Sequence, residues 1–313
     1  SGSVSIGYQA GSTSQNRNAI AIGVQSGEFV QASGSIAMGY QSGSTFQSTN
    51  AVAIGVQAGQ NTQGTNSVTI GYQAGQYLQS TSSIAMGYQA GQYTQGYNSI
   101  SIGNQAGQYT QGNYSINMGY QAGQYTQANY CISIGYQAGQ TLQSGNSIAI
   151  GYSAGSFTQS TNAIAIGTLA GAGFYNAVPT PGTQVDNPQE PGAVAIGILA
   201  GFAGQSTNAV SIGNYAGYAF QGVSTVAVGD HAGGGTFEGG YELPSYGSAQ
   251  QSGGVAMGLY AGNSAQGTNA IAIGVYAAQS AQGQNAVSIG EFSGQFKQGT
   301  NAIAIGNYAG NYT

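Results

Sequence analysis

Residues 83–98 read SIAMGYQAGQYTQGYN, and close variants of these sixteen residues recur along the whole chain. Pentads that end in Gly begin at Ser3 and return every 16 residues as far as Ala163. The pattern continues after each of two interruptions, which gives 18 copies in 313 residues. We number the repeat from the first pentad residue, so that Ser83 occupies position 1. Position 2 is Ile or Val in every copy, position 4 is Ile, Met or Val, and position 5 is Gly.

The pentad predicts a β-strand, because small and apolar residues alternate over positions 1–5 and most of the apolar residues are β-branched. Frequent glycine argues against helices. Sixteen residues suit two short strands joined by tight turns, and such repeats bury their apolar face only by stacking. The sequence therefore predicts an all-β fold, a parallel β-roll or β-solenoid of 18 sixteen-residue repeats.

The alternation also predicts which side chains fill the interior. Neighbouring strand residues point to opposite faces, so Ile, Val and Met at positions 2 and 4 are expected to point inward. Positions 1 and 3 are then expected to form an outward stripe of Ser and Ala. The stripe is interrupted only by Thr69, Asn117, Cys131, Thr225 and Gly254. A flat, uncharged stripe of this kind is expected to be covered by a partner.

Position 13 is Gln in every uninterrupted copy. The row includes Gln31, Gln63, Gln95, Gln127, Gln159, Gln205, Gln221, Gln266, Gln282 and Gln298. Stacked amides hydrogen-bond to one another along the axis of a stack of strands. We interpret the row as a structural ladder, and a ligand-binding row of glutamines is the alternative.

The array changes character after residue 167. Residues 1–167 form a regular array with Tyr-Gln favoured at positions 6 and 7, whereas residues 168–313 carry mainly large apolar residues at position 7. Two insertions, at about 172–192 and 234–253, lie in this second segment. Loops on a rigid scaffold commonly carry binding residues. The candidate recognition residues are therefore Asp186, Glu190, Glu238, Tyr241, Glu242 and Tyr246.

Two alternatives remain for the insertions, a weak Ca²⁺ site and solvated loops without a binding role. Calcium takes six to eight oxygen ligands, and the insertions contain no Asp-x-Asp spacing and no calcium-binding nonapeptide repeat. Neither a metal nor a cofactor is therefore expected.

Charge is nearly absent. Two Lys/Arg and seven Asp/Glu give a net charge of −5, and only 3% of residues are charged. A binder of nucleic-acid phosphates needs clustered cations, so this class is excluded.

Cys131 is the one cysteine, so an intrachain disulfide is impossible. No apolar run approaches the ~20 residues of a membrane span, so direct membrane insertion is not expected. The chain begins Ser-Gly-Ser without Met, which indicates processing or excision from a longer protein.

Two short stretches superficially match catalytic motifs. Asp230 and His231 are adjacent, and the side chains of adjacent strand residues are expected to point to opposite faces and not to cooperate. Residues 151–155 read GYSAG, which matches the Gly-x-Ser-x-Gly motif, but no helix is predicted to follow it. The sequence therefore predicts no enzyme.

The pentads Ser-Ile-Ala-Met-Gly and Ala-Val-Ala-Ile-Gly resemble the repeats of trimeric autotransporter adhesin heads, the YadA-like left-handed parallel β-roll. Residues 51–55 and 163–167 match this pattern closely, and the resemblance covers all 18 copies. Similar Gly-Tyr-Gln-Ala-Gly arrays are found in fibre proteins of large DNA viruses and phages. The family repeat usually has about 14 residues rather than the 16 of this chain. The resemblance implies a side-by-side homotrimer located extracellularly, at a cell or virion surface.

These observations favour a non-enzymatic structural or adhesive surface fibre, a head or shaft segment that displays a rigid polar rod for attachment. The expected partners are further copies of the chain, as a homotrimer or filament, and a host-surface glycan or protein. Tyrosines at position 11 would stack on sugars or simply shield the roll; they are Tyr77, Tyr93, Tyr109 and Tyr125.

Three alternatives remain, and the first is a serious one within the same structural class. It is a self-assembling extracellular filament subunit. The second is an ice-binding β-solenoid, for which the threonines at position 12 are too irregular. The third is a polysaccharide-cleaving β-helix enzyme, for which Glu28 and Glu291 are too isolated.

Overall fold

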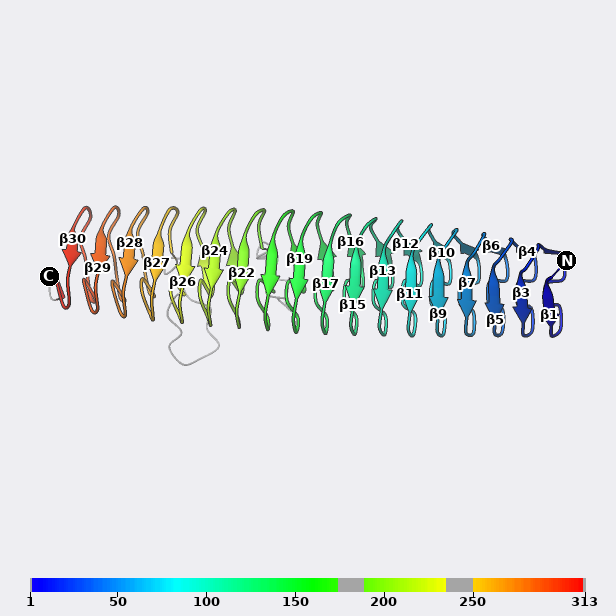
Figure 1. The fold of residues 1–313 in the computed structure, drawn as a ribbon. Coiled ribbons are helices and arrows are strands. Elements are labelled where there is room, and N and C mark those ends of the chain that lie inside the picture. The colour runs from blue at the N-terminus through cyan, green and yellow to red at the C-terminus, as the bar shows by residue number, and fades with distance from the viewer. Residues whose placement is uncertain (1, 174–188, 235–249, 312–313) are drawn as a thin grey trace, which may run out of the picture. The chain divides into compact units, whose positions relative to one another are not determined.

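The computed structural model describes residues 2–173, 189–234 and 250–311, and every regular element in this part is a β-strand. The chain divides into two compact units, Ser1–Asn146 and Ser147–Thr313. In each unit the chain winds in flat coils that stack with the sixteen-residue period of the sequence, as Figure 1 shows. The predicted all-β parallel β-solenoid is therefore confirmed.

The first unit contains two parallel sheets. Its long sheet consists of β1 (Val4–Ile6), β3 (Ile20–Ile22), β5 (Ile36–Met38), β7 (Val52–Ile54), β9 (Val68–Ile70), β11 (Ile84–Met86), β13 (Ile100–Ile102), β15 (Ile116–Met118) and β17 (Ile132–Ile134). Its short sheet consists of β2 (Ser14–Gln15), β4 (Val30–Gln31), β6 (Phe46–Gln47), β8 (Thr62–Gln63), β10 (Leu78–Gln79), β12 (Thr94–Gln95), β14 (Thr110–Gln111), β16 (Thr126–Gln127) and β18 (Leu142–Gln143). Each strand pairs with the equivalent strand one coil further on, for example Ile84 with Ile100.

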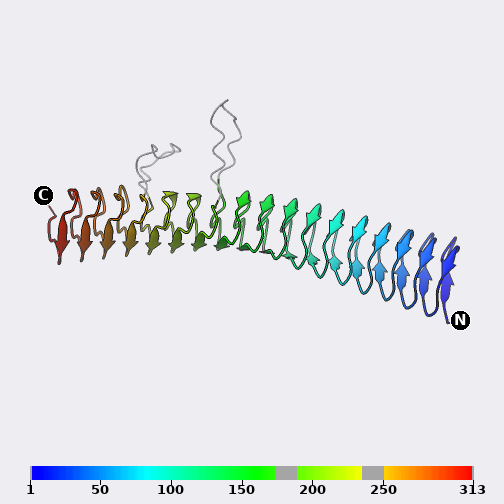
Figure 2. The ribbon, with the colours of Figure 1, turned by 90° about the horizontal axis from the view of Figure 1, so that it is seen from above.

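The second unit repeats this arrangement. Its long sheet consists of β19 (Ile148–Ile150), β21 (Ile164–Ile166), β22 (Val194–Ile196), β24 (Val210–Ile212), β26 (Val226–Val228), β27 (Val255–Met257), β28 (Ile271–Ile273), β29 (Val287–Ile289) and β30 (Ile303–Ile305). Its remaining strands are β20 (Thr158–Gln159), β23 (Ala203–Gln205) and β25 (Ala219–Gln221). Figure 2 shows the strands of each unit following one another in chain order.

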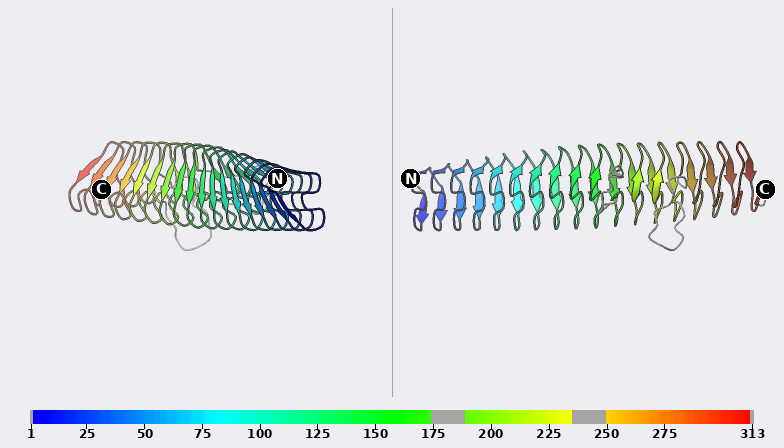
Figure 3. Two further views of the ribbon diagram at one scale, coloured as in Figure 1. Left: turned by 45° about the vertical axis from the view of Figure 1, so that its right-hand side comes forward. Right: turned by 180° about the vertical axis from the view of Figure 1, so that it is seen from behind.

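The turns are bonded from coil to coil as regularly as the strands. Gly103 N–H donates to the Met86 carbonyl at 2.8 Å, and Gln105 N–H donates to the Tyr88 carbonyl at 2.8 Å. Figure 3 shows the resulting flat loops from two further directions. In strands and turns alike, main-chain N–H and C=O groups form hydrogen bonds to the neighbouring coils. The main-chain polar groups of a coil are therefore satisfied by the coils on either side of it.

The prediction of which strand side chains point into the coil is wrong. Positions 1, 3 and 8 point into the coil, whereas positions 2 and 4 point outward. In β11, Ala85 is fully buried while the adjacent Met86 is 37% exposed. Cys131, expected on the outward stripe, is also fully buried. The interior is therefore lined by Ala, Ser and Gly, and Ile, Val and Met cover the outside of the long sheet.

The width of the coil explains this inversion. Ala74, Ala85 and Ala90 form one buried cluster. A Cβ atom added to Gly91 would come within 3.3 Å of the Ala85 Cβ, which is tighter than ordinary contact. Protein interiors are already close-packed, so positions 1 and 3 hold mostly Ala and Ser, and the larger Thr69 and Asn117 are exceptions.

The position-13 glutamines cross this narrow interior. The Gln95 side chain starts on β12, and its Nε2 donates to the Ile84 carbonyl on β11 at 2.7 Å. Between coils, Gln31 Nε2 donates to Gln47 Oε1 at 3.2 Å. A buried amide is costly without hydrogen bonds, and these contacts provide them. The row joins the two sheets of a coil and also links successive coils.

The same row continues beyond both insertions, at positions that the sequence analysis did not assign. Gln159 donates to Gln189 at 3.1 Å, and Gln189 donates to Gln205 at 3.1 Å. Gln221 donates to Gln250 at 3.1 Å. Gln189 and Gln250 therefore occupy position 13 in the two interrupted repeats.

Position 5 requires glycine because successive coils meet there. A Cβ atom on Gly103, whose φ is 133°, would lie 2.3 Å from the Gly119 carbonyl oxygen. We predict that Gly103→Ala lowers the free energy of unfolding by about 1–3 kcal/mol or more, measured by denaturant unfolding. Gly145→Ala is the matched control, because its Cβ would meet nothing closer than 3.6 Å. Equal stability of the two variants would contradict this packing.

Asn117 in the first unit has a buried polar atom without a partner, as Gln79 does too. Its Nδ2 donates to Gln127 Oε1 at 2.7 Å, but its buried Oδ1 has no hydrogen-bond partner. The equivalent Ser133 hydroxyl donates to Gln143 Oε1 at 2.7 Å. We predict that Asn117→Ser keeps the useful bond, removes the unpaired acceptor and raises stability by about 1 kcal/mol. A lower melting temperature than that of the wild type would show this assignment to be wrong.

Candidate functional site

Because equivalent side chains recur in each coil, the surface of each unit is made of columns that run along the stack. The first is the outward side of the long sheet, positions 2 and 4, which we call the apolar face. Representative exposures at position 4 are 38% for Met38, 37% for Ile54 and 39% for Met118. In the second unit, Ile212 is 39% and Met257 is 41% exposed. The apolar face, and not the small-residue stripe, is therefore the outward side of the long sheet.

A second column lies at position 7, where the backbone is strained. Every position-7 residue, whatever its type, has a φ of 50–57°. For a residue other than Gly, this left-handed conformation costs roughly 1–2 kcal/mol. The turn between the sheets therefore requires this conformation in each coil, and the side chains that occupy it differ between the two units.

In the first unit, position 7 carries glutamines that form a surface ladder. Gln89 Nε2 donates to Gln73 Oε1 at 3.0 Å. The buried position-10 glutamines run beside it, and Gln92 donates both to Gln76 at 2.9 Å and to Gln73 at 3.1 Å. These two rows of amides brace the turn along the stack.

In the second unit, position 7 holds Ser153, Leu169 and Leu199 and then, from Tyr215 onward, an aromatic column. The ring centroids of Tyr215 and His231 are 4.8 Å apart, and those of His231 and Tyr260 are 4.7 Å apart. The column continues through Tyr276, Phe292 and Tyr308 at 4.9–5.4 Å. Stacked aromatic pairs contribute about 0.5–1.5 kcal/mol each beyond their burial, which offsets the backbone strain.

Asp230 and His231 are in contact, contrary to expectation. His231 Nδ1 and Asp230 Oδ1 are hydrogen-bonded. Positions 6 and 7 lie in a turn rather than a strand, so the alternation rule does not apply to them. Tyr215 and Tyr260 stack on the two faces of the His231 ring. This arrangement makes His231 part of the aromatic column.

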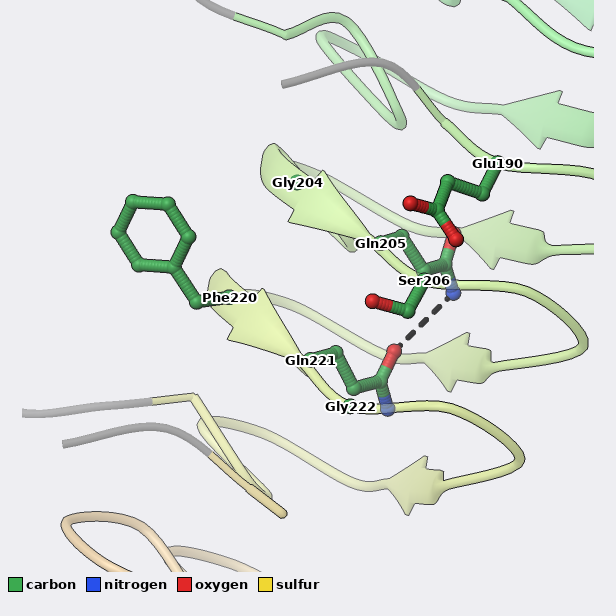
Figure 4. A pocket seen from close by; sticks show the side chains of 7 residues that line it. All are labelled: Glu190, Gly204, Gln205, Ser206, Phe220, Gln221 and Gly222. Atoms are coloured by element: carbon green, nitrogen blue, oxygen red, sulfur yellow. Dashed lines mark hydrogen bonds between the residues drawn. The ribbon is translucent and has the colours of Figure 1, made fainter. Parts of the chain in front are cut away.

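Of the predicted recognition residues, Glu190 is the one that the structure places. Its Oε2 accepts hydrogen bonds from Thr207 N–H and Thr207 Oγ1, both at 2.8 Å. Glu190 also borders a shallow hollow of about 170 Å³, shown in Figure 4. The other residues around it are Gly204, Gln205, Ser206, Phe220, Gln221 and Gly222.

The remaining predicted recognition residues lie outside the described part of the chain. They are Asp186, Glu238, Tyr241, Glu242 and Tyr246. Among residues 2–173, 189–234 and 250–311, no group of three His, Cys, Asp or Glu side chains could hold a metal ion. The same residues contain no helix that could cross a membrane.

Tyr218 is the described titratable group whose pKa its surroundings clearly shift. Its ring stacks on Phe202 with centroids 5.5 Å apart. Burial raises the pKa of Tyr218 above its ordinary value of 10.0, and the nearby Tyr215 adds to this rise.

A raised native pKa means that the neutral phenol of Tyr218 contributes stability below the unfolded pKa. This contribution is lost as the pH rises from 10.0 through the raised pKa. We predict that the decline in unfolding free energy over this alkaline range is smaller in Tyr218→Phe than in the wild type, measured by denaturant unfolding at each pH. Identical declines would contradict the assignment.

Comparison with known proteins adds no family name. No protein-family model matches the chain, and no curated protein matches it. What is shown is therefore a parallel β-solenoid with an outward apolar face and ordered polar and aromatic columns.

Proposed function

We propose that the chain is a non-enzymatic structural or adhesive segment of an extracellular fibre at a cell or virion surface, assembled as a side-by-side homotrimer. The apolar face carries this proposal. Soluble monomers rarely expose contiguous apolar patches larger than a few hundred Å². Here every coil of each unit adds an outward Ile, Val or Met to the same face.

Further copies of the chain suit this face better than a charged partner does. Residues 29–146 contain no Asp, Glu, Lys, Arg or His, so electrostatic complementarity contributes little there. An identical flat face on a second copy supplies the missing apolar contact. Homo-oligomers usually close by rotational symmetry, and the resemblance to trimeric adhesin heads favours three copies.

An attachment role follows from what lateral assembly leaves exposed. With the apolar faces covered, the short-sheet side and the turns remain outside, with their Gln, Tyr, Thr and Asn columns. Repetition makes such a surface rigid and multivalent, and multivalency strengthens weak binding without new contacts. A self-assembling extracellular filament subunit is the alternative within the same class.

Light scattering of the native protein over a dilution series tests the assembly. We predict a discrete species with three times the mass of one chain. Met86→Glu, which places a charge on the apolar face, is predicted to lower that mass because burying an unpaired charge is costly. Thr62→Glu is the matched control, because Thr62 is exposed on the short sheet, and it should leave the mass unchanged.

Other results of the light-scattering experiment would favour the alternative or overturn the proposal. A mass that grows without limit as the concentration rises would favour the filament subunit. A wild-type chain that remains monomeric at every concentration would overturn lateral assembly. Circular dichroism of each variant separates lost assembly from lost folding.

A further inference from the structure

The tyrosines at position 11 form a regular aromatic column on the first unit. Tyr77, Tyr93, Tyr109 and Tyr125 follow one another with ring centroids 5.1, 5.1 and 5.2 Å apart. Their planes differ by only 3–6°. Each side chain is 39–45% exposed. Each tyrosine comes directly before one of the strands β10, β12, β14 and β16. Figure 1 labels three of these strands, β10, β12 and β16.

The stacking leaves part of each ring available. Carbon atoms in contact lie about 3.5–4.0 Å apart, so parallel rings with centroids 5.1 Å apart are offset rather than eclipsed. An offset stack leaves part of a ring face uncovered, which agrees with the 39–45% exposure of these tyrosines. The column therefore presents an aromatic strip to solvent at each coil.

A column of position-12 side chains runs beside the tyrosines. Thr94 pairs in register with Thr110, and Thr110 with Thr126. All three threonines are exposed, and Leu78 and Leu142 bound the row at its two ends. A threonine hydroxyl therefore follows the aromatic ring in the coils of Tyr93, Tyr109 and Tyr125.

The lack of charged residues around the tyrosine column restricts the kind of ligand that can bind there. Residues 29–146 contain no ionisable acid or base other than tyrosine and Cys131. Acidic and basic ligands would find no counter-charge there. The complementary ligand is neutral, rich in hydroxyl groups, and repetitive along its length.

We propose that the position-11 tyrosines and position-12 threonines bind a neutral, extended β-1,4-linked polysaccharide that lies along the stack. The ring spacing of 5.1–5.2 Å is close to the advance per sugar in such a chain, so successive sugars meet successive rings. The C–H groups of each sugar contact an aromatic strip, and its hydroxyls reach the phenol and threonine hydroxyls. This inference rests on the proposed attachment function and names its ligand class.

Binding of the full chain to insoluble cellulose and to insoluble chitin tests the proposal, with soluble β-1,4-linked oligosaccharides of increasing length to measure affinity. We expect retention on at least one solid and an affinity that rises with length until the sugars cover the four tyrosines. The two solids separate glucose from N-acetylglucosamine chains. The α-1,4-linked chain of amylose, which coils, should not be retained.

The double variant Tyr93→Ala and Tyr109→Ala should bind about tenfold more weakly or not at all. Tyr72→Ala with Tyr88→Ala is the matched control, because these rings also stack, with centroids 5.3 Å apart, but at position 6. It should bind as the wild type does. Thermal melting confirms that both double variants are folded.

Three outcomes would overturn the inference: no retention on either solid, equal loss in both double variants, or equal binding of amylose. Failure of the proposed assembly is a separate result. A monomeric chain whose glycan binding depends on Tyr93 and Tyr109 would sustain this inference alone. A trimer that retains neither polysaccharide would sustain the assembly alone.

Discussion

The narrow interior of the coil is the constraint on which the rest of the structure depends. Alanine methyl groups and one glutamine side chain occupy the space between the two sheets, as around Ala85 and Gln95. This width favours small side chains at positions 1, 3 and 8. The position-13 amide fills the remaining space, because it spans the gap and hydrogen-bonds to the opposite strand. Much of the cohesion of a coil therefore comes from backbone and amide hydrogen bonds rather than from a conventional apolar core.

The same constraint determines the surface. Large apolar side chains that do not fit inside are displayed on the long sheet, where Met86 and its equivalents form the apolar face. The sharp turn at position 7 holds every residue there at a left-handed φ. Amide ladders in the first unit, and stacked rings from Tyr215 onward in the second, brace this turn. Interior packing and surface columns are consequences of a single coil geometry.

Repetition explains what could be predicted from the sequence. The sixteen-residue period fixes the register, and the small–apolar alternation locates the long-sheet strands. Alternation shows which residues share a face, but it does not say which face is inside, because that depends on the distance between the sheets. The sequence did contain an indication of the narrow interior. Position 8 is Ala or Ser in every copy, as expected where side chains are crowded inside the coil. The Asp230–His231 contact was missed because a turn, not a strand, positions both residues.

The stability of Ala85→Leu tests the narrow interior most directly. Ala85 is fully buried and packs against Ala74 and Ala90, so the added carbons would crowd these two residues. Overpacking of this kind typically costs about 1–3 kcal/mol, and this account predicts a loss at or above that range in denaturant unfolding. An unchanged unfolding midpoint would mean that position 3 faces outward and would contradict the account.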